Sequence, residues 1–162
     1  MAATAFLAAA CGSSSSTTSA TTSSITSATA GGTTLVTARP VTGLGTVLVN
    51  GQGRTLYVFE PDKHAKVTCV GGCAGVWPPL MLAGKAEPSG GVNAALVASD
   101  PDPAGGRVVT YNGWPLYLYT GDSQAGTASG QALNSSGGLW YVITPAGKVV
   151  TTKKESSGGS IY

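Results

Sequence analysis

Two cysteines, Cys69 and Cys73, and the side chains near them have the strongest chemical character in this sequence. His64 precedes the pair and Met81 follows it, and thiolate, imidazole and thioether groups together suit copper. The same two thiols can instead close a disulfide, because the two glycines between them permit a tight turn. An oxidising exterior favours the disulfide. We expect a structural disulfide here, with metal binding or redox exchange as the first alternative and free thiols as the second.

Two carboxylates, Asp62 and Asp122, occupy matching positions in two similar segments. Such a pair can in principle perform the acid–base chemistry of glycosidases. A Ser-His-Asp arrangement would have to use the single histidine, His64, and the sequence contains no Gly-x-Ser-x-Gly element. It also lacks a Gly-rich phosphate loop and a dinucleotide fingerprint. Because a turn carboxylate can accept backbone N–H groups, we expect both aspartates to be structural, and the protein not to be an enzyme and to need no cofactor.

Aromatic side chains form the other candidate site. Alternating tyrosines can offer a stacking face to a glycan, a quinone or the edge of a porphyrin. Paired strands that carry Tyr and Trp also form a core and its rim, and we favour this simpler interpretation. The set consists of Tyr57, Phe59, Trp77, Tyr111, Trp114, Tyr117, Tyr119, Trp140 and Tyr141.

An internal repeat places these side chains. Two segments about 61 residues apart each contain an Asn-Gly between two β-prone runs, which is a strong hairpin signal. Each then reads Leu-Tyr-x-aromatic-x-x-Asp, so that Tyr57 and Phe59 face the same side of a strand, as do Tyr117 and Tyr119. Each copy ends near a tryptophan. The pattern therefore predicts an all-β fold with two tandem, pseudo-symmetric copies.

Each copy is expected to contain about four short antiparallel strands, eight in all. A small sandwich or barrel is the natural way for two such copies to hide their strand edges. No segment has a convincing helical period, although residues 93–97 can form a single turn of helix.

The motif Tyr-x-aromatic-x-x-Asp, at 57–62 and again at 117–122, resembles the signature of the bacterial secreted-repeat lipoproteins. The block from Cys69 to Leu80 and the segment 111–117 are also similar to pieces of that family, and the resemblance covers roughly residues 35–145. It implies an extracytoplasmic lipoprotein without established catalytic residues, in a family named for its unknown role. The motif residues are Tyr57, Phe59, Asp62, Trp77, Tyr117, Tyr119, Asp122 and Trp140.

The N-terminus predicts export. Residues 1–10 are small and apolar and end in three alanines before Cys11, a sequence that a lipoprotein signal peptidase accepts. Leu7 lies one position too far from the cysteine, no Lys or Arg precedes it and the apolar stretch is short, three defects that a start codon further upstream would explain. A diacylglyceryl group on Cys11 supplies two chains for stable anchoring and leaves Cys69 and Cys73 to pair.

Composition limits the remaining function classes. The net charge of +2 is small and the basic residues are scattered, so the sequence predicts no basic patch that would bind nucleic acid. We expect a monomer, anchored by Cys11 to the outer face of the cell membrane, that serves as a binding or structural module for an unknown ligand; the alternative is an extracytoplasmic redox or copper-handling protein. The predicted parts are a signal segment (1–10), a Ser/Thr-rich tether (11–32), a β domain (33–151, with repeats at 33–83 and 94–151) and a flexible tail (152–162).

Overall fold

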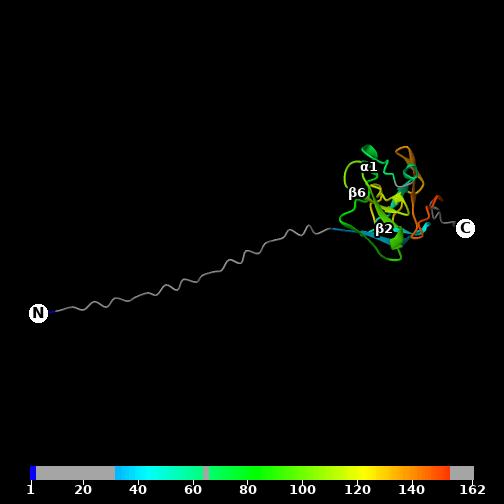
Figure 1. The fold of residues 1–162 in the computed structure, drawn as a ribbon. Coiled ribbons are helices and arrows are strands. Elements are labelled where there is room, and N and C mark those ends of the chain that lie inside the picture. The colour runs from blue at the N-terminus through cyan, green and yellow to red at the C-terminus, as the bar shows by residue number, and fades with distance from the viewer. Residues whose placement is uncertain (3–31, 64–65, 154–162) are drawn as a thin grey trace. The chain divides into compact units, whose positions relative to one another are not determined.

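The computed structural model describes residues 1–2, 32–63 and 66–153. The chain divides into two units, residues 1–30 and 31–162, and the fold below is that of the second unit (Figure 1). The predictions for Cys11, for His64 and for most of the tail lie outside the described residues. Within the described part, no helix is both long and apolar enough to cross a membrane.

The fold is mostly β, as the sequence predicts. The described residues form nine short strands and very little helix. The strands are β1 (Thr33–Val41), β2 (Gly45–Asn50), β3 (Tyr57–Phe59), β4 (Lys85–Pro88), β5 (Val97–Pro101), β6 (Arg107–Tyr111), β7 (Trp114–Pro115), β8 (Leu133–Ser135) and β9 (Gly138–Val142). The helical pieces are α1 (Gly72–Val76) and the 3-10 turns η1 (Glu60–Asp62) and η2 (Ala94–Leu96), of which η2 is the turn expected at 93–97.

The arrangement of the strands differs from the expected sandwich or barrel. In the described residues they form three separate three-stranded sheets, ordered β2-β1-β4, β3-β9-β8 and β5-β6-β7, and these do not close into one barrel. Two strands were not expected: β4 pairs in parallel with β1, and β8 forms a hairpin with β9. β4 reads Lys-Ala-Glu-Pro and β8 reads Leu-Asn-Ser, and most of these residue types are uncommon in strands, so their sequences give little strand signal.

The segment after Trp77 is the opposite case, because we expected a regular strand and the structure has none. Pro79 and Met81 make only isolated bridges, to Tyr117 and Val108. Pro78 and Pro79 have no N–H group to donate to a ladder, which limits pairing to single contacts.

The Asn-Gly hairpins form, in two different ways. Between β6 and β7, Asn112 and Gly113 both have positive φ, 48° and 76°, as a tight two-residue turn requires. In the first repeat the turn is wider, and the Asn50 side chain accepts hydrogen bonds from the backbone N–H groups of Gln52 and Arg54.

The two repeats interlock through the backbone. Strand β3 of the first repeat pairs with β9 of the second, with Val58 opposite Tyr141. At the centre, the Tyr57 N–H donates to the Tyr117 carbonyl at 2.8 Å, and the Tyr117 N–H returns the bond at 2.9 Å. Each repeat thus supplies strands that the other repeat completes.

The interior consists of two cores on opposite faces of β3. Tyr57 and Phe59 point into an aromatic core with Trp77, Tyr117 and Trp140. Val58 points the other way, into a mainly aliphatic core that contains side chains such as Leu48, Leu56, Val109, Leu116 and Ile143. The alternation predicted for β3 is therefore confirmed.

Candidate functional site

The tyrosines and aspartates of the family motif pair across the two repeats. The Tyr57 hydroxyl donates to Oδ2 of Asp122 at 2.6 Å. The Tyr117 hydroxyl donates to Oδ2 of Asp62. Each motif thus supplies the donor for the carboxylate of the other motif, and the four groups tie the repeats together.

The remaining carboxylate oxygens are also occupied. Oδ1 of Asp62 accepts hydrogen bonds from the backbone N–H of Thr68, at 2.9 Å, and from its hydroxyl. Oδ1 of Asp122 accepts from the backbone N–H of Ser129 at 2.8 Å. The two aspartates are only 0% and 2% exposed. Both hold the turns that follow their strands, as the sequence predicts.

Burial changes the acidity of these groups. It raises the pKa of the Asp62 carboxyl above its ordinary value, while hydrogen bonds from Thr68 and Tyr117 oppose that rise. Burial also raises the pKa of the Tyr57 hydroxyl strongly, and the hydrogen bond to Asp122 and its charge add to the effect. The pKa of Tyr117 rises for the same reasons, with Asp62 as the partner. Both phenols therefore remain protonated donors at neutral pH.

The other motif side chains form a continuous stack of four rings. Trp77 and Trp140 lie parallel at its centre, with ring centroids 3.9 Å apart. Tyr119 covers the outer face of Trp77 and Phe59 covers that of Trp140, each at 4.2 Å. Each tryptophan is thus covered by the aromatic residue of the other repeat, so the stack follows the same exchange as the Tyr–Asp pairs.

Residues outside the motif complete the stack, and the sequence did not reveal them. Ser135 in β8 accepts both indole N–H groups, from Trp77 at 3.3 Å through its hydroxyl and from Trp140 at 3.0 Å through its carbonyl. Gly130 leaves room for the rings, because a Cβ there would lie 2.6 Å from Trp77. The only sequence sign of these roles is that both follow Asp122 within the second repeat.

Cys69 and Cys73 form a disulfide, with Cα atoms 5.2 Å apart. Cys69 is buried against the aromatic core, and Cys73 is partly buried at the start of α1, which lies at the edge of the folded unit in Figure 1. The closed pair offers no thiolate to a metal. Within the residues that the structure covers, no cluster of three or more His, Cys, Asp or Glu side chains is arranged to hold a metal ion. Met81 is 42% exposed, and the predicted fourth member, His64, lies outside these residues.

Two partly buried aromatic side chains lie outside the stack. Trp114 and Tyr141 are only partly buried and line a hollow of about 120 Å³ that is open to solvent. Val58 and Val149 form its apolar walls, while the rim carries Glu60, Lys63 and Thr151.

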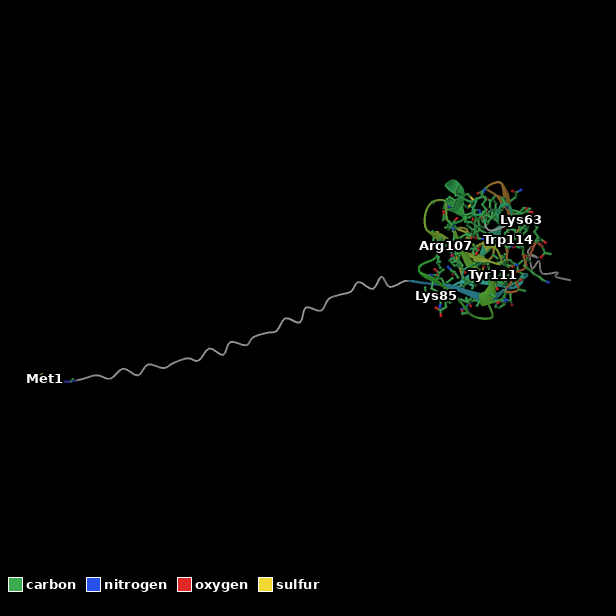
Figure 2. All side chains as sticks on the ribbon, viewed as in Figure 1. Met1, Lys63, Lys85, Arg107, Tyr111 and Trp114 are labelled. Atoms are coloured by element: carbon green, nitrogen blue, oxygen red, sulfur yellow. A yellow bond between two sulfur atoms is a disulfide. The ribbon has the colours of Figure 1, made fainter. Side chains whose placement is uncertain are left out.

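A second hollow shares Lys63 and Trp114, which Figure 2 shows side by side. The motif residues form the core, so the hollow between Trp114 and Tyr141 is the candidate binding site.

The fold and the motif geometry define a two-repeat β protein held together by its own signature residues. The model of a lipoprotein family described as "Secreted repeat of unknown function" matches residues 41–81 and 100–144, together more than half of the chain. The chain therefore belongs to this secreted-repeat family, which confirms the resemblance seen in the motifs. A search of curated proteins finds no match. A search of solved structures finds none either.

Proposed function

We propose that the protein is a non-enzymatic module of the cell envelope, anchored to the outer face of the membrane by a lipid on Cys11. The observation that carries the non-enzymatic part is the use of Asp62 and Asp122. A general acid or base must reach a substrate proton. These carboxylates are buried and already bonded to Tyr117, Tyr57 and the turns that follow them. These carboxylates therefore stabilise the fold.

Support for the anchor comes from the sequence and from the family. Three alanines precede Cys11, and the family is one of secreted lipoproteins. A Ser/Thr-rich segment of about 21 residues lies between Cys11 and the domain in the sequence, and such a composition is typical of linkers. The domain at its end then acts by binding outside the membrane.

The anchor is tested by labelling the natural full-length precursor with a radioactive fatty acid in a bacterial host. Wild type should incorporate label and sediment with membranes. Cys11→Ala should incorporate none and stay unprocessed or be released, while Cys73→Ala should label like wild type. The proposal is contradicted if the wild-type protein takes up no label and is found in the medium.

Redox or copper handling is the second candidate, favoured by the unequal burial of the two sulfurs. Cys73 is the more exposed partner, so an external thiolate has access to one side of the disulfide. Titration of the reduced chain with Cu(I) against a competing chelator separates the two functions. Stoichiometric copper retention that disappears in Cys69→Ser/Cys73→Ser would favour this candidate. Failure to retain copper supports the structural role of the pair.

A further inference from the structure

We propose that the hollow between Trp114 and Tyr141 binds a sugar ring of an extracellular glycan. The inference deepens the proposed function, since it names a ligand class for the module, and it rests on that function for the place where the ligand is met. Three observations carry it: the shape of the hollow, the chemistry of its rim, and the way it breaks the symmetry of the repeats.

The shape is set by three elements that the fold brings together. Val58 on β3 lies opposite Tyr141 on β9, and these two supply the floor and one wall. Trp114 follows the tight Asn112-Gly113 turn, and the Asn112 amide holds that turn by donating to the Gly147 carbonyl at 2.9 Å. The hollow holds about 120 Å³, less than the roughly 300 Å³ of pockets that enclose a whole ligand, and it is open to solvent, so it can cover one face of a ring.

A second hollow, of about 320 Å³, continues past Trp114 and Lys63 toward Asn112 and Gly113. The two hollows share these side chains, so one extended ligand can contact both. A chain of linked rings fits this outline better than a single compact molecule.

The rim chemistry selects among flat ligands. Glu60 and Lys63 lie 3.7 Å apart with exposed side chains, so one offers an acceptor and the other a donor at the mouth of an otherwise apolar hollow. A sugar ring has apolar C–H faces that pack on aromatic rings and hydroxyl groups that both donate and accept. A quinone supplies only acceptors, so it can bond the Lys63 ammonium but cannot donate to the Glu60 carboxylate. The hydroxyl-rich ring satisfies both groups.

The repeats provide an internal control, because equivalent positions face equivalent packing demands. When the two motifs are aligned, Tyr141 is equivalent to Pro78, and Glu60 is equivalent to Thr120. The pairing of the two hairpins makes Trp114 equivalent to Arg54. In the first repeat Arg54 bonds the Tyr119 carbonyl at 2.8 Å across its own surface. The fold therefore does not require an aromatic residue at the positions of Trp114 and Tyr141, or an acidic one at that of Glu60. Their presence on one side only indicates a role beyond folding.

Calorimetric titration of the purified full-length chain with maltotriose, cellotriose and the trisaccharide of N-acetylglucosamine tests the site. We expect saturable binding of at least one trisaccharide. Trp114→Ala should weaken it about tenfold or more, because the stacking surface is lost. Lys63→Ala should weaken it less. Lys85→Ala, an exposed cation on β4 toward the opposite side of the unit in Figure 2, should bind like wild type.

A fluorescence signal confirms the location, because Trp77 and Trp140 are fully buried and only Trp114 meets solvent. A bound ring should shift the tryptophan emission of wild type and of Lys85→Ala. The proposal is overturned if none of the three sugars binds, or if Lys63→Ala and a folded Trp114→Ala bind with unchanged affinity. If no sugar binds but Cys11 still takes up labelled fatty acid, the sugar-binding proposal is wrong, whereas the proposal of a membrane-anchored module is retained.

Discussion

The hydroxyl groups of Tyr57 and Tyr117 show how single residues stabilise this protein. Each phenol is fully buried and bonds a carboxylate from the other repeat. A bond between a hydroxyl and a buried charge stabilises more than a neutral bond, and removing one partner leaves the charge unsatisfied. The motif is therefore explained by folding, without assigning it a ligand.

Alkaline pH should weaken the protein in a way that reports these two phenols. Their pKa values in the fold lie above the ordinary value, so their stabilisation is complete below the unfolded pKa of about 10 and is lost as pH rises toward the folded value. Each should lower the free energy of unfolding by about 1.4 kcal/mol per pH unit above about pH 10. Guanidinium unfolding measured from about pH 9 to about pH 11, roughly one unit on each side of that pKa, gives the slope of unfolding free energy against pH.

The matched variant for this prediction is Tyr117→Phe, which should show about half the alkaline slope. Absorbance at 295 nm gives an independent check: among the six tyrosines, Tyr57 and Tyr117 should titrate only when the chain unfolds. All six titrating together in the folded protein would contradict the burial of these hydroxyls.

At the scale of elements, the loop after Asp122 is shaped by the ring stack. A Cβ on Gly130 would lie 2.6 Å from Trp77 and 3.1 Å from Tyr57. Gly130→Ala should therefore cost about 1–3 kcal/mol of unfolding free energy through overpacking. Gly72→Ala in α1, where nothing lies within 4 Å of the added atom, is the control and should be near neutral. Equal denaturation midpoints for the two variants would show that the rings yield without strain.

The disulfide around α1 should contribute modestly. Cys69 and Cys73 are four positions apart, and a loop this short removes about 2 kcal/mol of unfolded-state entropy by the chain-entropy relation. Cys69→Ala/Cys73→Ala should lower the melting temperature by several degrees without loss of the fold, as calorimetry can measure. Complete unfolding of the variant would show that the pair is essential to the core.

The sequence predicted local elements well and their partners poorly. The Asn-Gly turns, the same-side placement of Tyr57 and Phe59, and the turn role of Asp62 all follow from short-range chemistry and appear in the structure. The partner of β3 could not be predicted, because pairing within a repeat and pairing between repeats satisfy the same pattern. β4 was not predicted, because its pairing with β1 depends on the path of the connection that leads to it rather than on its own residues.

The candidate site shows the same limit. Trp114 and Tyr141 were visible as aromatic residues, yet nothing in their spacing separated them from Trp77 and Trp140. Only the fold shows that two of these four are fully buried and two line a hollow. A comparison of the repeats, position by position, would have marked Trp114 and Tyr141 as the residues that the symmetry does not demand.

At the scale of the whole molecule, the two repeats form one folding unit. The bonds of Tyr57 and Tyr117, the ring stack and the β3–β9 pairing all join residues from different repeats. Neither repeat buries its own aromatic residues without the other. The exchanged motif contacts therefore interlock the two repeats.

A double-mutant cycle on stability tests that claim most directly, with Tyr57→Phe combined in turn with Asp122→Asn and with Asp62→Asn. Tyr57 and Asp122 should couple by about 1 kcal/mol or more, because the two variants alter the two ends of the same charge-assisted bond. Tyr57 and Asp62, which share one motif in the sequence, should be close to additive. Strong coupling within the motif and additivity between Tyr57 and Asp122 would contradict the interlocked arrangement.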